Sequence, residues 1–413
     1  MLDADDGEAG LREPPRDLLA ADPQADDHHV HLLCFAHGHQ LSTICGYRAP
    51  MSADRNIDGF VAPGYEPVRD AFAAQPRGGS ALAVHRHGEP VVDLREGWAD
   101  AARTRPWGAD TLVNVYSVGK PVVALAVLLL VDRGLIALDD PIARHWPGFR
   151  TEASVRQLLT HTAGLPFFPV PRDAAAWSDW DLLCADLAAA APEWPPGTVA
   201  AEHALTYGHL TGELVRRVDG RSPERFVAEE IARPWRLDLG FGTTEPHRCA
   251  DLEFDGPDRA AELLGAPGSV HARAVSNPHG ARDLAVLNSD LWRRAVIPAV
   301  NLHATADALA RFYSGLLAGG VLDGRRLLSA ALVTDLGSAH FSGPDLFLGR
   351  DTTWGLGVQL EPDGTWGMGG LGGNAAWADP ATGHTIGYVT RRIGDFARVE
   401  AIDGAISSVR LLT

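Results

Sequence analysis

The chain has 413 residues, of which 46% are hydrophobic, and it carries a formal charge of -17 at pH 7. This length allows one large domain or two, with enough apolar side chains for a sizeable core. The negative charge argues against nucleic acid and anionic membranes as partners, because both attract basic surfaces. The longest apolar run, residues 121–131, is too short to cross a bilayer and fits a buried helix.

The cysteines and the N-terminus bear on the cellular compartment. The four cysteines are widely spaced and match neither a metal-ligand spacing nor a disulfide framework. The N-terminus is acidic and lacks the basic and apolar regions of a secretory signal. We therefore expect a cytoplasmic protein without a bound metal, and the oligomeric state is left open.

Residues 1–50 differ from the rest of the chain. They combine acidic and polar runs with a histidine-rich stretch, and they show no helical or strand periodicity. The histidine spacing fits no metal site. We predict a disordered extension over 1–50 and a single catalytic domain over 51–413, with Met51 as a candidate for the true start.

The remaining pattern alternates between strand-like and helical segments. It predicts, in chain order, a hairpin over 80–94, a helix over 117–134, mostly helical structure over 136–324, strands over 354–360, 374–378 and 385–389, and a helix over 396–412. Strands at both ends imply one sheet that the two ends build together, at 57–135 and 325–413. The helical middle then packs beside this sheet, which is an α+β arrangement.

Ser117 and Lys120 form the most informative short motif. Lys120 is the only lysine, since the other 35 basic residues are arginines. A serine and a lysine three positions apart at the start of a helix lie on one face. A serine hydroxyl is a weak nucleophile without a neighbouring base, and burial can lower the pKa of a lysine enough for it to act as that base. The motif therefore predicts nucleophilic catalysis by Ser117.

The motif at 117–120, combined with the Leu-Leu-Thr-His-Thr-Ala-Gly-Leu sequence at 158–165, resembles the serine β-lactamase-like superfamily. Segments such as the Trp-Pro-Pro-Gly-Thr at 194–198 resemble its esterase branch, the family VIII carboxylesterases. The resemblance implies an antiparallel sheet flanked by helices and an acyl-enzyme mechanism without a cofactor. It also implies a structural role for His161, which bonds the loop backbone.

The second motif of this superfamily contains a tyrosine that shares proton transfer with the lysine. Five residues after Gly197 the chain has Glu202 instead, and the nearest tyrosine is Tyr207. Either Glu202 takes the place of the tyrosine as a carboxylate able to accept a proton, or a shifted turn presents Tyr207 with His209 nearby. His203 is a third candidate. The sequence leaves these alternatives open.

The third motif corresponds to the glycine-rich run at 366–374. By the resemblance, the backbone N–H groups of Ser117 and Leu371 form the oxyanion hole. Met368, Gly369 and Gly370 are the expected substrate-binding residues, because glycines let a substrate approach the strand backbone. Met368 stands where relatives carry a cation or imidazole that recognises a carboxylate, and a thioether cannot do so.

These observations predict a serine hydrolase, most closely a carboxylesterase that acts on a neutral ester. The expected partner is a small-molecule ester or acyl substrate. One alternative is a transacylase that passes the acyl group to an amine or alcohol. Another is a catalytically weak homologue that binds a ligand or partner through the same cleft, because two of the three motifs are altered.

Overall fold

The computed structural model describes residues 57–410 apart from 75–77, 258 and 264. The expectations for residues 1–50 and for Met51 as the start lie outside the described residues. Among the residues that are described, no helix combines the length and apolar character needed to cross a membrane.

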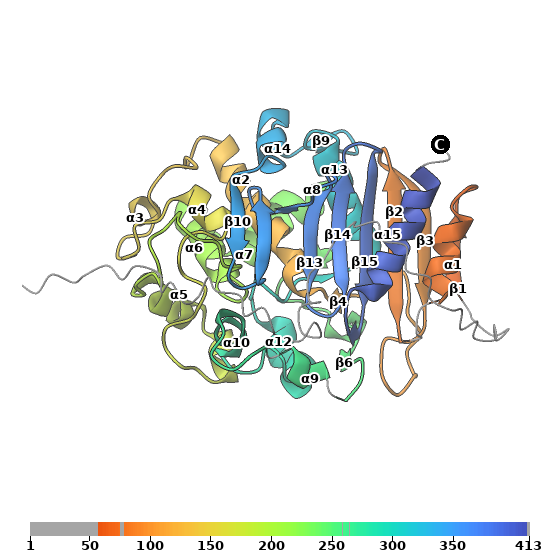
Figure 1. Ribbon diagram of the computed structural model, residues 1–413, viewed down its shortest axis with the longest axis horizontal. Coiled ribbons are helices and arrows are strands. Elements are labelled where there is room, and N and C mark those ends of the chain that lie inside the picture. Colours follow the sequence, from red (N-terminus) through yellow and green to blue (C-terminus); the bar gives the residue numbers. More distant parts are fainter. Residues whose placement is uncertain (1–56, 75–77, 258, 264, 411–413) are drawn as a thin grey trace, which may run out of the picture.

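A nine-stranded sheet, antiparallel at every neighbouring pair, forms the centre of the molecule (Figure 1). The strand order is β1 (Ile57–Val61), β3 (Glu89–Glu96), β2 (Ser80–Arg86), β15 (His384–Thr390), β14 (Asn374–Asp379), β13 (Trp366–Gly370), β12 (Gln359–Leu360), β11 (Arg350–Trp354) and β10 (Phe341–Asp345). The N-terminal and C-terminal strands meet where β2 pairs with β15. The predicted α+β fold, with an antiparallel sheet built from both chain ends, is confirmed.

The strand predictions are right except at one position. The hairpin of β2 and β3 and the strands β14 and β15 lie where the sequence predicts them. The predicted strand over 354–360 is wrong, because the chain turns between β11 and β12. Gly357 has φ +86° in this turn, and a Cβ there would lie 2.2 Å from the Cβ of Ala124. The turn is thus fixed by close contact with a helix that is distant in sequence.

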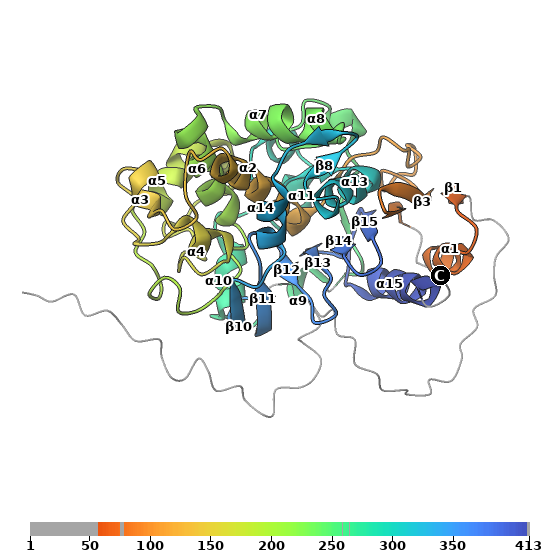
Figure 2. The same ribbon diagram turned by 90° about the horizontal axis from the view of Figure 1, so that it is seen from above.

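Helices cover both faces of the sheet. At the edge of the sheet formed by β1 and β3, α1 (Glu66–Ala74) packs against α15 (Ala397–Arg410) over one face (Figures 1 and 2). On the other face, α13 (Ala306–Leu317) packs on β15 and β2. The buried core accordingly has one large cluster on the α13 face and a smaller one beneath α1 and α15.

The segment between β3 and β10 includes the range 136–324 that was predicted to be mostly helical, and helices are its main regular elements. Its helices are α2 (Lys120–Asp132), α3 (Ile142–His145), α4 (Val155–Leu159), α5 (Trp180–Ala188), α6 (Tyr207–Asp219), α7 (Pro223–Val227), α8 (Arg233–Trp235), α9 (Arg259–Glu262), α10 (Val270–Ser276), α11 (Leu284–Leu287), α12 (Asp290–Arg294), α13 and α14 (Ala330–Leu336). The short strands are β4 (Val113–Asn114), β5 (Leu239–Gly240) and β7 (His303–Ala304) in one sheet, the pair β6 (Glu253–Phe254) and β16 (Arg392–Ile393), and the pair β8 (Val321–Leu322) and β9 (Arg325–Arg326).

Helix α2 is the buried centre of this segment. Its first eleven residues are all buried, which explains why the run lacks the polar stripe of a surface helix. Pro121 fits the first turn, where no N–H partner is needed, and Gly134 ends the helix with φ +68°. The packing of α2 against α6 and α7 therefore fixes the position of the residue with which it begins, Lys120.

Candidate active site

Ser117 lies in a tight turn that joins β4 to α2. Residues Tyr116–Gly119 form a 3-10 turn, and Lys120 begins the helix directly after it. Tyr116 has φ +50°, a left-handed conformation that is unfavourable for a residue with a side chain. A Cβ on Gly119 would lie 2.6 Å from the Cβ of Leu302, so this turn is held against the chain leading into β7.

The Lys120 side chain is completely buried and points to three oxygen atoms. Its Nζ lies 2.6 Å from Ser117 Oγ, 3.2 Å from the Ala299 carbonyl oxygen and 2.9 Å from Glu202 Oε1. A buried ammonium group is costly unless such partners surround it. Burial lowers the pKa of Lys120, and the neighbouring Glu202 carboxylate opposes that shift. Lys120 is thereby brought closer to the pH range in which it can exchange a proton.

Glu202 completes the polar group around Ser117. It lies in the loop before α6, is 2% exposed, and accepts a hydrogen bond from Ser117 Oγ at 3.1 Å. Of the alternatives that the sequence leaves open, Glu202 is the one that the structure brings to both Ser117 and Lys120.

Tyr207 does not contact Ser117. Its hydroxyl donates to the Leu159 carbonyl oxygen at 3.4 Å, its ring is fully buried at the start of α6, and burial raises the pKa of its hydroxyl. This matches an aromatic residue packed against its own helix. His209 is also buried, and its ring stacks on Trp180. The catalytic alternative that combines Tyr207 with His209 therefore has no support in the geometry.

His161 and His203 hold the loop that carries Glu202. The backbone N–H of His203 donates to His161 Nδ1 at 3.1 Å, and His203 Nε2 accepts from the backbone N–H of Leu165 at 3.2 Å. Burial lowers the pKa of His203 to about 4, so the ring is neutral near pH 7. Both rings bind backbone atoms and neither bonds to Ser117, which agrees with the structural role expected for His161.

Asp345 is a buried carboxylate that the sequence analysis did not identify. It ends β10, and its Oδ1 accepts hydrogen bonds from the backbone N–H groups of Glu202, Phe347 and Leu348 at 3.1, 2.9 and 3.0 Å. Its Oδ2 accepts from Trp354 Nε1 at 3.0 Å. Asp345 therefore fixes the backbone at Glu202 from a strand more than 140 positions away. No local sequence pattern marks such a residue.

Replacing Asp345 should destabilise the fold in a graded way. Asp345→Ala leaves four donors without an acceptor, so we expect a loss of at least about 2–4 kcal/mol in the free energy of unfolding. Asp345→Asn retains an oxygen for the three backbone donors and loses only the acceptor for Trp354, so the loss should be smaller. Urea unfolding of both variants at pH 7 measures the order, and an equal loss in the two would contradict it.

The pH dependence of stability gives a second measure of Asp345. Burial raises its pKa from 3.8 to about 6, so the folded protein binds this proton more tightly than the unfolded chain does. Between about pH 4 and pH 6 the unfolded chain releases the proton first, and the stability contributed by Asp345 falls as the pH rises. The stability of wild type relative to Asp345→Asn should therefore decrease across this window and stay constant above it.

Strand β13 forms the wall beside Ser117. Leu371 follows the last residue of β13 and lines the same pocket as Ser117, as the predicted oxyanion hole requires. A Cβ on Gly370 would lie 2.3 Å from the Val115 carbonyl oxygen. Gly370 thus lets the strand approach the nucleophile turn, which differs from the expected role of admitting substrate.

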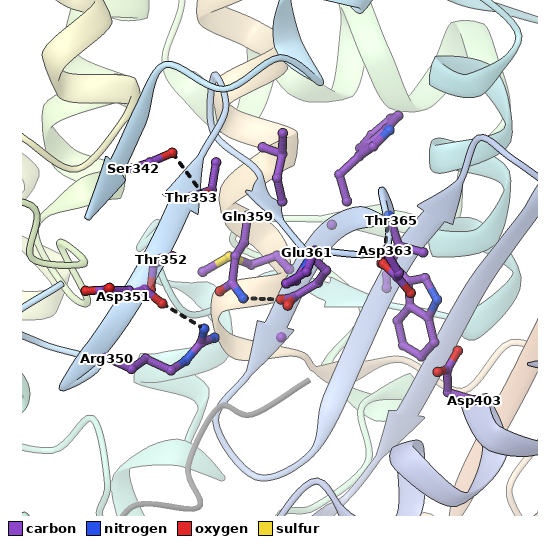
Figure 3. A pocket seen from close by; sticks show the side chains of 18 of the residues that line it. Ser342, Arg350, Asp351, Thr352, Thr353, Gln359, Glu361, Asp363, Thr365 and Asp403 are labelled. Atoms are coloured by element: carbon purple, nitrogen blue, oxygen red, sulfur yellow. Dashed lines mark hydrogen bonds between the residues drawn. The ribbon is translucent and has the colours of Figure 1, made fainter. Parts of the chain in front are cut away.

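Two cavities adjoin this wall. A pocket of about 50 Å³ is lined by Ser117, Glu202, Gly369 and Leu371, with a mostly apolar remainder. A groove of about 1100 Å³ crosses the outer strands β10–β13 and is lined by Met368, Gly369 and polar side chains such as Arg350 and Asp363 (Figure 3). Gly369 borders both cavities, whereas Met368 borders only the groove. Met368 is 4% exposed and packs against Ala200 and Trp354.

No cluster of three His, Cys, Asp or Glu side chains arranged for a metal ion occurs in the described part of the chain. The groups assembled around Ser117 are suited to acyl transfer: a hydroxyl, a buried amine and carboxylate in contact with it, and Leu371 at the end of the neighbouring strand, which lines the same pocket.

Comparisons with known proteins identify the family of this chain. The beta-lactamase family profile matches residues 53–408. LipL of Mycobacterium tuberculosis, named an esterase/beta-lactamase, is 35% identical over 373 residues, which cover 83% of this chain and 84% of LipL. The crystal structure of a family VIII carboxylesterase matches with a TM-score of 0.78 and 32% identity, covering 86% of this chain and all of the other.

A penicillin-binding protein homologue from Caulobacter crescentus is similar to the same extent, with a TM-score of 0.75 and 36% identity over 86% of this chain and all of the homologue. The matched regions include the nucleophile turn, the loop with Glu202 and strand β13. The family profile and the long relatives agree with the fold. The chain therefore belongs to the beta-lactamase family and is a serine hydrolase of its β-lactamase and esterase group.

Proposed function

We propose that this protein hydrolyses carboxylic esters through an acyl-enzyme on Ser117. One observation carries the proposal: Ser117 Oγ contacts both Lys120 Nζ and Glu202 Oε1, while those two groups contact each other at 2.9 Å. Ser117 Oγ attacks the ester carbonyl carbon, and the alcohol leaves. Water then attacks the acyl carbon and releases the acid and Ser117. The N–H groups of Ser117 and Leu371 stabilise the oxyanion in both steps.

The proton of Ser117 passes to the pair formed by Lys120 and Glu202. If the pair rests as ammonium and carboxylate, Glu202 accepts the proton. If both rest neutral, Lys120 accepts it. Both routes reach the same state, in which protonated Glu202 and the Lys120 ammonium flank the serine alkoxide. The ammonium group stabilises the alkoxide electrostatically, and the proton is later donated to the departing alcohol.

The substrate class follows from the walls of the site and from the relatives. Met368 provides no charge on β13, at the position where the resemblance implies a residue that helps β-lactamases and D,D-peptidases recognise the substrate carboxylate. This supports an ester over a penicillin or a peptidoglycan stem. LipL is named an esterase/beta-lactamase, and a family VIII carboxylesterase has a similar fold. Transfer of the acyl group to an amine or alcohol uses the same acyl-enzyme and differs only in the second nucleophile.

A fluorophosphonate probe followed by mass spectrometry tests the acyl-enzyme, and we expect one adduct on Ser117 that Ser117→Ala abolishes. Hydrolysis of 4-nitrophenyl butyrate, with and without added amines or alcohols, then separates water from other acceptors. Absence of the adduct would favour a ligand-binding homologue without activity. Hydrolysis of nitrocefin that requires Ser117 would extend the substrates to β-lactams.

A further inference from the structure

The small pocket beside Ser117 contains an uncompensated positive charge. Its apolar lining includes Leu205, Leu263, Val300 and Phe347, and its two side chains with a full charge are Glu202 and Arg282. Glu202 is neutralised by Lys120 at 2.9 Å. Arg282 therefore contributes a cation that the rest of the pocket does not balance.

Arg282 has no acidic partner within the described part of the chain. It lies in the loop between α10 and α11, is partly buried, and donates its one hydrogen bond from Nη1 to the Leu263 carbonyl oxygen at 3.0 Å. Most of the partly buried arginines among the described residues form ion pairs, as Arg172 does with Asp186 at 2.9 Å. A guanidinium has five N–H donors and stays charged, so Arg282 retains donors for a ligand.

The loop that carries Arg282 is anchored at its start. Asn277 accepts a hydrogen bond from the backbone N–H of Arg172 at 2.8 Å and donates to the carbonyl oxygens of Phe168 and Val170 at 2.9 and 2.8 Å. These hydrogen bonds hold the start of the loop in place, so a ligand that binds there loses less free energy in ordering the loop.

Tyr116 supplies a second polar group to the same pocket. Its hydroxyl is buried, with the residue 2% exposed, and it has no hydrogen-bond partner among the described residues. A buried hydroxyl without a hydrogen-bond partner lowers the stability of the folded protein, so its presence calls for an explanation such as a bound ligand. The Arg282 charge acts on this hydroxyl, since it lowers the pKa of Tyr116 against the larger increase caused by burial. The two groups thus face a common region next to the nucleophile.

We propose that Arg282 and Tyr116 bind a carboxylate of the substrate, so that the preferred esters carry an acidic group a few bonds from the ester carbonyl. This inference rests on the proposed esterase function of Ser117. It revises the expectation of a neutral ester, which considered only the β13 wall and Met368. A pocket of about 50 Å³ holds a group of a few heavy atoms, which fits a short acidic chain.

Binding to Ser117→Ala protein tests the proposal without requiring hydrolysis. The probes are monomethyl succinate, with the carboxylate on the acyl side, carboxymethyl butyrate, with it on the alcohol side, and the neutral methyl butyrate. By calorimetry we expect one of the two acidic esters to bind at least tenfold more tightly than methyl butyrate, which also identifies the side. Adding Arg282→Gln should remove that preference, and adding Tyr116→Phe should reduce it severalfold.

Matched variants separate charge recognition from folding. Arg69→Gln removes an equal charge from the exposed side of α1 and should leave the preference unchanged. Arg282→Lys keeps the charge without the planar fork and should retain part of the preference, and thermal melting checks that each variant is folded. Equal binding of acidic and neutral esters, or a preference that survives in folded Arg282→Gln, would overturn the proposal.

Hydrolysis by the wild type distinguishes this inference from the proposed function. If methyl butyrate is hydrolysed and the ratio of kcat/KM values between the acidic and the neutral ester is the same in Arg282→Gln, the esterase function stands and the carboxylate site is wrong. If the acidic ester binds through Arg282 and no ester is hydrolysed, the carboxylate site stands and the esterase function is wrong.

Discussion

Lys120→Arg should lower the rate of acylation of Ser117 by about 10³-fold or more, although it keeps the positive charge. General acid–base catalysis contributes roughly 10²–10⁴-fold, and an arginine cannot release its proton at accessible pH. The side chain is 0% exposed and its Nζ lies 2.6 Å from Ser117 Oγ, so a guanidinium also cannot occupy the same position. The rate of 4-nitrophenol release in single-turnover experiments, with enzyme in excess over substrate, measures the acylation rate directly.

Lys120→Met is the companion variant, because it has a similar length and volume and removes the charge. Both variants should lose acylation, whereas only Lys120→Arg retains a cation beside the nucleophile. Circular dichroism and thermal melting check that each protein is folded. Acylation within tenfold of wild type in folded Lys120→Arg would show that Lys120 acts by charge alone and that it is not part of the base.

Glu202→Gln should reduce acylation by about 10²-fold and shift its pH dependence. The variant loses the acceptor of the Ser117 proton, but Lys120 can still accept a proton when neutral. The Glu202 carboxylate raises the pKa of Lys120 against the larger effect of burial, so its removal lowers that pKa further. Since neutral lysine increases as the pH rises through this pKa, the rising limb of the pH–rate profile should move to lower pH.

Tyr207→Phe is the matched control for Glu202→Gln. It removes only a hydroxyl bonded to the Leu159 carbonyl oxygen, so kcat/KM should change by no more than about twofold, with a stability loss of about 1 kcal/mol. The two variants together test which residue replaces the tyrosine of the second motif. A large loss in Tyr207→Phe with near-normal activity in Glu202→Gln would reverse the assignment.

Much of the fold could be predicted because its signals are local. The strand-like runs of β2, β3, β14 and β15 and the continuous apolar run of α2 depend on neighbouring residues, and the structure places these elements close to their predicted ranges. The strand predicted at 354–360 was wrong because the turn at Gly357 results from contact with Ala124, more than 200 positions earlier. Periodicity within a segment contains no information about such a contact.

The residues of the site divide in the same way. The sequence by itself predicted that Ser117 and Lys120 lie together, because positions three apart at a helix start lie on one face, and the structure places Lys120 Nζ 2.6 Å from Ser117 Oγ. The choice between Glu202 and Tyr207 depended on the direction of the loop before α6, which the hydrogen bond from the Glu202 backbone to Asp345 fixes from strand β10. Only the tertiary structure could decide it. Asp345, Tyr116 and Arg282 come from separate elements, and their roles arise from burial and from partners distant in sequence, which become visible only when the chain is folded.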